Sequence, residues 1–114
     1  MTGCSRGDVV LVGFVFTDET DVRRRPAVIV SSDTYHRERQ EAIIAAITSR
    51  TDRLLVGDHL INDWRGAGLL FPSVATGIVR TIKQGMIAHR LGSMPSTDMR
   101  AIEDKLRLIL GLPE

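Results

Sequence analysis

The chain has 114 residues and a formal net charge of +1, which is enough chain for one domain, residues 1–114, with one modest core. Aromatic residues make up only 4% of it, which argues against a sheet that binds RNA by stacking bases on Phe and Tyr platforms. The single cysteine, Cys4, cannot form an internal disulfide, and the scattered histidines do not group with acids as metal ligands would. We therefore expect no metal, no cofactor and a reducing, cytoplasmic location.

Charge is unevenly distributed along the chain. Residues 23–53 hold seven arginines against four acids, whereas residues 1–22 hold one arginine against four acids. Thirteen of the 15 basic residues are arginine, which favours bidentate contacts with phosphate. The middle of the chain can therefore form a local basic face although the net charge is small. The longest apolar runs are far too short to span a bilayer, so no membrane association is expected.

The first half of the chain predicts three buried strands separated by polar turns. An apolar run at 9–14 and a β-branched run at 26–30, which begins with proline, have strand character. Glu41–Thr48 fits a helix or a strand by periodicity, and its shortness and polar flanks favour the strand. Residues 17–22 are expected to form a loop, and residues 31–36, which start with capping residues, a short helix or turn.

Strand signals are weaker in the second half. Three further segments are expected to form strands, at 54–61, 74–82 and 86–91. Gly77 interrupts the second of them and predicts a bulge or a close approach of another segment. The one convincing helix is Ser96–Leu110, with Ser96 as its N-cap and Gly111 as its C-terminal stop. These elements predict a mostly β fold with one C-terminal helix, arranged as a small, curled, mostly antiparallel barrel.

Two polar groups lie at the ends of buried runs. Arg25 stands directly before Pro26, which holds it in an extended conformation, and Thr48 ends the next strand. If these two strands are antiparallel neighbours, Arg25 and Thr48 meet at one rim of the sheet. A guanidinium and a hydroxyl on rigid strands can bind a phosphate and stabilise charge that develops on it. Each residue alone is an ordinary surface arginine or strand threonine, so this interpretation depends on the pair.

Several segments resemble, in chain order, the MazF/PemK family of toxins. They are the opening at 6–12 with 14–18, the second strand at 25–31, the third strand at 46–49, and the later segments at 68–74 and 80–82. The closing helix, which ends at 108–112, is also similar to theirs. The resemblance covers nearly the whole chain, and the order of the segments is more specific than any one of them.

The resemblance implies an SH3-like barrel of the type shared with the gyrase toxin CcdB, and a homodimer. It implies the toxin of a type II toxin–antitoxin system, neutralised by a cognate antitoxin protein. The implied activity is metal-independent, sequence-specific cleavage of single-stranded RNA, in which the ribose 2′-OH attacks the adjacent phosphate. The products would carry 2′,3′-cyclic phosphate and 5′-OH ends. The family's catalytic arginine matches Arg25, and its catalytic Ser or Thr matches Thr48.

Further RNA contacts are expected around this pair. Arg23 and Arg24 are placed in the loop before the strand, and the remaining candidates are Thr17, His36, Ser49 and Arg80. The sequence also departs from some relatives, because residues 17–24 contain no histidine and Lys83 stands where some carry an acid. Two alternatives stay open. One is a gyrase poison of the CcdB type, and the other is a non-catalytic RNA-binding or interaction module of the same fold.

Overall fold

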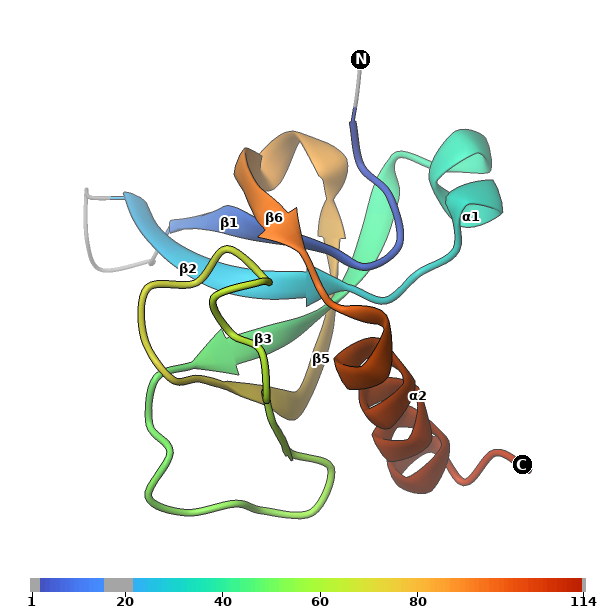
Figure 1. Cartoon of the computed structure of the whole chain (residues 1–114). Coiled ribbons are helices and arrows are strands. Elements are labelled where there is room, and N and C mark those ends of the chain that lie inside the picture. The colour runs from blue at the N-terminus through green and yellow to red at the C-terminus, as the bar shows by residue number, and fades with distance from the viewer. Residues whose placement is uncertain (1–2, 16–21, 114) are drawn as a thin grey trace.

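Six antiparallel strands form one curled sheet in a computed structural model that describes residues 3–15 and 22–113. The strand order is β4-β5-β3-β2-β1-β6. The strands are β1 (Asp8–Val15), β2 (Val22–Ile29), β3 (Glu41–Thr48), β4 (His59–Leu60), β5 (Val74–Lys83) and β6 (Ile87–Ser93). Two helices, α1 (Asp33–Glu38) and α2 (Ser96–Leu110), flank the sheet, and a 3-10 turn at Gln84–Met86 joins β5 to β6. Figure 1 shows α2 beside the sheet and α1 at the start of β3.

The expected fold class is confirmed as a mostly β fold with one long C-terminal helix. The sheet curls strongly but is not a closed barrel, because β4 and β6 are its two edges. The strand at Glu41–Thr48 and the helix at Ser96–Leu110 have the expected bounds, and the short helix after residue 31 is present as α1. The N-cap of α2 is Pro95 rather than Ser96, and Gly111 caps its C-terminus with a φ of 68°.

The second strand begins earlier than expected. β2 starts at Val22, so Arg23 and Arg24 lie within a strand and not in a loop. Pro26 consequently lies in mid-strand, opposite Leu11 of β1. The pairing of β2 with β3 reaches only as far as Ala27, so the segment before it has a neighbour on one side only. A residue without an amide hydrogen is tolerated there, as it is on an edge strand.

The expected strand at 54–61 is wrong for most of its length, since only His59–Leu60 pair with β5. Local hydrogen bonds compete with strand formation at this position. The Asp58 carboxylate accepts the Leu55 N–H at 2.9 Å, and the Leu55 carbonyl accepts the Asp58 N–H at 3.0 Å. In this turn Val56 is 79% exposed. The apolar residues here therefore do not form a buried strand, although their pattern suggests one.

The sheet carries a buried cluster on each face. The helix-side cluster packs strand residues against α2 and the 61–69 segment, and it contains Val9, Val28, Ala45, Ile47, Ile61, Ala67, Leu69, Ala75, Met94, Met99 and Ile102. The inner cluster lies on the opposite face and contains Val10, Val12, Ala27, Ile29, Ile44 and Ile82. Alternate residues of β1, β2 and β3 go to the two clusters, as the two-residue period of a strand requires. The face on which a strand residue lies can therefore be identified from the cluster that contains the residues two positions before or after it.

Gly77 lies at a bulge and at a close approach, and both expectations for it are confirmed. Ala45 pairs with Val79 and Ile47 with Ala75, so residues 76–78 of β5 lie opposite the single residue between them on β3. A Cβ at Gly77 would lie 3.2 Å from the Val56 carbonyl oxygen, which leaves little room for a side chain. The bulge thereby brings the 49–58 loop against β5, next to the end of β3.

Candidate active site

The register of β2 and β3 brings Arg25 and Thr48 to the same end of the sheet. Ala27 pairs with Ala46, Val28 with Ala45 and Ile29 with Ile44. Continuing that register by two residues puts Arg25 across from Thr48. Both lie on the face of the inner cluster, because Arg25 pairs with Val12 and alternates with Ala27. The two residues therefore share one face as expected, but Arg25 lies in the middle of β2 rather than at its start, and only Thr48 stands at a strand end.

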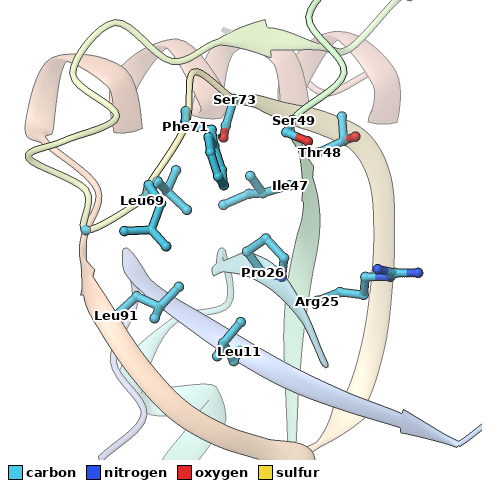
Figure 2. A pocket seen from close by; sticks show the side chains of 12 residues that line it. Leu11, Arg25, Pro26, Ile47, Thr48, Ser49, Leu69, Phe71, Ser73 and Leu91 are labelled. Atoms are coloured by element: carbon cyan, nitrogen blue, oxygen red, sulfur yellow. Dashed lines mark hydrogen bonds between the residues drawn. The ribbon is translucent and has the colours of Figure 1, made fainter. Parts of the chain in front are cut away.

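The Arg25 guanidinium is available to a ligand. Arg25 is exposed, and it makes no hydrogen bond or ion pair with the residues that the structure describes. Figure 2 shows its side chain directed away from Leu69 and Phe71 and to the same side as the Thr48 hydroxyl. An arginine that is held on a strand without a carboxylate partner keeps its donors for an incoming anion.

The Thr48 hydroxyl is oriented by the turn that follows it. Its Oγ1 accepts the Arg50 N–H at 3.2 Å. That bond occupies a lone pair on the oxygen, so the hydroxyl hydrogen remains free to point elsewhere and donate. Thr48 is partly buried at the end of β3, which limits the movement of the group. The site can therefore present an oriented neutral donor beside a positive charge.

A cavity of about 500 Å³, here called the strand-end cavity, adjoins both residues. Its walls are mostly apolar and come from β1, β2, β3, β6 and the 68–73 segment (Figure 2). The lining includes Leu11, Pro26, Ile47, Leu69 and Leu91, with Arg25, Thr48 and Ser49 as polar groups at the edge. This is a common pattern for a ligand site, in which an apolar cavity has a few polar groups placed together.

The three consecutive arginines divide between the two faces of β2. Arg23 pairs with Phe14 and Arg25 with Val12, whereas Arg24 lies between them in the strand. Successive strand residues point to opposite faces, so Arg23 shares the inner face with Arg25 and Arg24 lies on the other face. All three are exposed. The triplet is thus not a uniform basic cluster, and only alternate members can act together.

Ser49 directly follows Thr48, whereas Arg80 and His36 lie farther from the pair. Arg80 is exposed on the inner face but pairs with Ile44, four residues before Thr48 on β3. His36 lies on α1, at the opposite end of β3 from Thr48 (Figure 1). Its ring is almost fully buried, with Nε2 2.5 Å from the Ser31 hydroxyl oxygen. The remaining candidate, Thr17, lies outside the described residues.

Sequence reasoning did not identify the 70–73 segment as part of the site. Phe71 is 63% exposed and lines the strand-end cavity, and the Ser73 hydroxyl donates to the Phe71 carbonyl at 2.8 Å. The sequence feature that could have indicated this segment is a pair of large apolar residues, Leu70 and Phe71, directly before Pro72. Apolar residues beside a turn former are ambiguous, because they fit a strand end as well as an exposed loop.

Among residues 3–15 and 22–113, no three His, Cys, Asp or Glu side chains come together as a metal-binding group. Within the same ranges, neither helix is both long and apolar enough to cross a bilayer.

Comparison with known proteins shows a matching family and several solved structures of similar fold. A family model described as "PemK-like, MazF-like toxin of type II toxin-antitoxin system" matches residues 5–110. Among solved structures, an endoribonuclease in complex with its cognate antitoxin from a mycobacterial species is similar at 20% identity and a TM-score of 0.77. That match covers 98% of this chain and 99% of the other. A MazE–MazF structure from Deinococcus radiodurans matches at 19% identity, a TM-score of 0.74, and coverage of 96% and 98%. The Mycobacterium tuberculosis toxin MazF-mt6 matches at 18% identity, a TM-score of 0.75, and coverage of 94% and 99%.

Proposed function

Because the chain belongs to the family of PemK-like, MazF-like toxins of type II toxin–antitoxin systems, we propose that it is an endoribonuclease that cleaves single-stranded RNA at short sequence motifs. The observation that carries the proposal is the placement of Arg25, in the middle of β2, on the same face as Thr48 and across from it at the end of β3. A similar mycobacterial protein is named an endoribonuclease, which agrees with that chemistry. The cleavage proceeds without a bound metal ion, since both residues can stabilise charge on phosphate directly.

The reaction is a transesterification at phosphorus. The ribose 2′-OH attacks the adjacent phosphate, the bond from phosphorus to the 5′-oxygen breaks, and the products are a 2′,3′-cyclic phosphate and a 5′-OH. One proton leaves the 2′-oxygen and one is gained by the 5′-oxygen, so the step is balanced without a co-reactant. Its transition state carries extra negative charge on the non-bridging oxygens, which is where positioned donors accelerate the step.

Arg25 and Thr48 contribute differently to that transition state. Arg25 stays protonated at any working pH, so it supplies a constant positive charge and two parallel donors. Thr48 donates one hydrogen bond to a non-bridging oxygen of the phosphate. The Arg50 N–H donates to Thr48 Oγ1 and so holds the hydroxyl in place. The mechanism requires a 2′-OH, so DNA is not cleaved.

The neighbouring residues bind the RNA backbone. Arg23 and Arg80 lie on the inner face with Arg25 and extend the positive charge along β2 and β5. Ser49 contacts the nucleotide held at Thr48, and Arg24 acts from the other face. Thr17 and His36 remain candidates for RNA contact. For His36, contact requires the RNA to reach α1 and the buried ring to become accessible, since the ring is beside Ser31.

The protein works in the cytoplasm as a homodimer and is neutralised by a cognate antitoxin. An acidic, partly disordered antitoxin segment would fold on binding to the basic face and block access to Arg25. A similar mycobacterial endoribonuclease is named as a complex with its cognate antitoxin, which supports this arrangement. Light scattering of the purified chain checks the dimer, and co-purification with a co-expressed candidate antitoxin checks the complex.

The test is cleavage of a mixed single-stranded RNA in excess chelator. Wild-type protein should give fragments with 2′,3′-cyclic phosphate and 5′-OH ends. Arg25→Ala and Thr48→Val should each slow cleavage about a hundredfold or more, which is the usual cost of losing one donor to a developing oxyanion. Arg100→Ala, which removes an exposed arginine from α2, should cut at the wild-type rate.

The outcomes separate the alternatives. Chelator-sensitive cutting, or undiminished cutting by Arg25→Ala, contradicts the proposed mechanism. Gyrase-dependent breaks in DNA without RNA cleavage would indicate a gyrase poison of the CcdB type. RNA binding without any cleavage would indicate a non-catalytic module of the same fold.

A further inference from the structure

Thr48 lines two cavities, one on each side of it. The first is the strand-end cavity, and the second, of about 410 Å³, lies between the 50–58 loop and the bulge of β5. We call the second the loop cavity. Its floor includes Ala46, which alternates with the buried residues of β3 and pairs with Ala27 on the inner face. The loop cavity therefore opens on the face to which the Thr48 hydroxyl belongs.

The frame of the loop cavity is fixed by hydrogen bonds. Asp58 Oδ1 accepts the Gly77 N–H at 3.0 Å, and Oδ2 accepts the Leu55 N–H at 2.9 Å. The Thr76 hydroxyl donates to the Ala46 carbonyl at 2.7 Å and accepts the Ile78 N–H at 3.1 Å. These bonds join the loop, the bulge and β3 into one unit. They also occupy the oxygens of Asp58 and Thr76, so these two side chains are committed to the frame.

Three charged side chains of the lining are left to face a ligand. Arg50 and Asp52 form an exposed pair at 3.5 Å, which is too solvated to hold either group firmly. Arg53 makes no hydrogen bond or ion pair with any residue of the described ranges. The rest of the wall is apolar and unusually open, since Val56 is 79% exposed and Ile78 is 61% exposed. Exposed apolar side chains beside the Arg53 guanidinium suit a planar ring with acceptor atoms at its edge.

We propose that the loop cavity binds the nucleobase next to the scissile phosphate, and that Arg53 determines which base is preferred there. This inference rests on the proposed function, because it takes the phosphate to be held at Arg25 and Thr48. The base stacks against the exposed apolar wall, and the Arg53 guanidinium donates to the acceptors at its edge. The nucleoside on the other side of the phosphate then lies toward the strand-end cavity. The two cavities differ in their polar groups, so the two positions flanking the cut are read by different chemistry.

The experiment compares the sequence profiles of cleavage by wild-type protein and by Arg53→Ala on a randomised RNA library. The variant removes an exposed side chain that has no partner among residues 3–15 and 22–113, so the fold should be unaffected. We expect the base preference at one position next to the cut to weaken about tenfold, the discrimination that a single base contact provides, while the other positions keep theirs. Arg100→Ala is the matched control and should reproduce the wild-type profile at every position.

A second measurement separates base reading from catalysis. Oligonucleotides with a 2′-deoxynucleotide at the cut site cannot be cleaved, so anisotropy reports binding alone. Arg53→Ala should bind the preferred oligonucleotide more weakly than wild type does. For an oligonucleotide with a different base at the flanking position, the variant and the wild type should have the same affinity. An unchanged profile in the variant, or a change only at positions remote from the cut, would overturn the inference while leaving the ribonuclease intact. If the wild type cuts no RNA, the proposed function has failed instead, and the inference fails with it.

Discussion

Replacement of Asp98 by asparagine should destabilise the fold, although Asp98 is far from the proposed chemistry in sequence. Asp98 is 1% exposed in the first turn of α2, and its carboxylate accepts three hydrogen bonds. Oδ1 lies 2.7 Å from His59 Nε2 and 2.8 Å from the Asn62 N–H, and Oδ2 accepts the Asp63 N–H at 3.1 Å. The carboxylate thus joins α2 to the segment that leads out of β4.

The magnitude follows from the geometry of the three donors. An asparagine oxygen can replace Oδ1, but its NH₂ group then faces the Asp63 N–H, donor against donor. One buried donor is left unsatisfied, which costs about 1–3 kcal/mol, and the charge that strengthens the His59 contact is lost as well. We therefore expect Asp98→Asn to lower the free energy of unfolding by about 3 kcal/mol and the melting temperature by about 10 °C.

The loss should depend on pH with a definite sign. Burial acts to raise the pKa of Asp98, but the hydrogen bonds from Asn62, His59 and Asp63 outweigh it, and the pKa is lowered overall. A lowered pKa in the folded state means that the stabilisation is present above the unfolded value, about 3.9 for an aspartate, and is lost as the pH falls through the folded value. The difference between wild type and variant should therefore be largest near neutral pH and shrink below about pH 4.

Thermal and urea unfolding followed by circular dichroism, from pH 7 down to 3, measures this difference. Asp104→Asn is the matched control on the same helix, because within the described part of the chain its carboxylate makes only an exposed pair with Arg107. It should change stability by less than about 0.5 kcal/mol. Equal stability of Asp98→Asn and wild type at pH 7, or a gap that stays constant down to pH 3, would refute the reasoning.

Two further predictions concern the packing around the sheet. Gly92→Ala should destabilise the fold by about 2 kcal/mol, because the new Cβ would lie 2.6 Å from the Ala67 carbonyl oxygen and force β6 away from the loop. Gly85→Ala meets nothing within 4 Å and should be neutral in the same melting assay, so equal losses from both would contradict the contact. Burial raises the pKa of the Cys4 thiol to about 11, with Asp8 and Asp33 adding to the effect. Alkylation by iodoacetamide at pH 8 should therefore be about a hundredfold slower than for a small free thiol, and an ordinary rate would show that the thiol is not buried.

The sequence predicts well those elements whose pattern of apolar residues matches their burial in the fold. Glu41–Thr48 is buried on both faces at the centre of the sheet, so its apolar run reports its environment directly. Ser96–Leu110 has Met99 and Ile102 on one buried face and Gly111 as its end. Arg25 and Thr48 could be brought together because antiparallel neighbours place the start of one strand beside the end of the next.

Other features depend on contacts that are remote in sequence, and these could not be predicted. Arg23 and Arg24 read as loop residues because the pairing with β1 that extends the strand is not encoded locally. The apolar residues at 54–56 resemble a strand, but a side chain from Asp58 ties them into a turn. Asp98 gives no sign in the sequence of accepting bonds from a segment 35 and more residues away. The loop cavity is likewise formed only when the bulge at Gly77 meets the loop.

The division of the arginine triplet between two faces has a consequence for how this strand tolerates insertions and deletions. Either one-residue shift of β2 against β1 would move Arg24 to the inner face, and the shift in one direction would place it opposite Val12, where Arg25 now stands. The same shift would exchange Val28 with Ala27 and Ile29, and both buried clusters would lose their fit. The arginines therefore do not by themselves determine how β2 pairs with β1. The fit of the buried residues in the two clusters determines it. Changes of length are consequently expected to be tolerated before β2 but not within it.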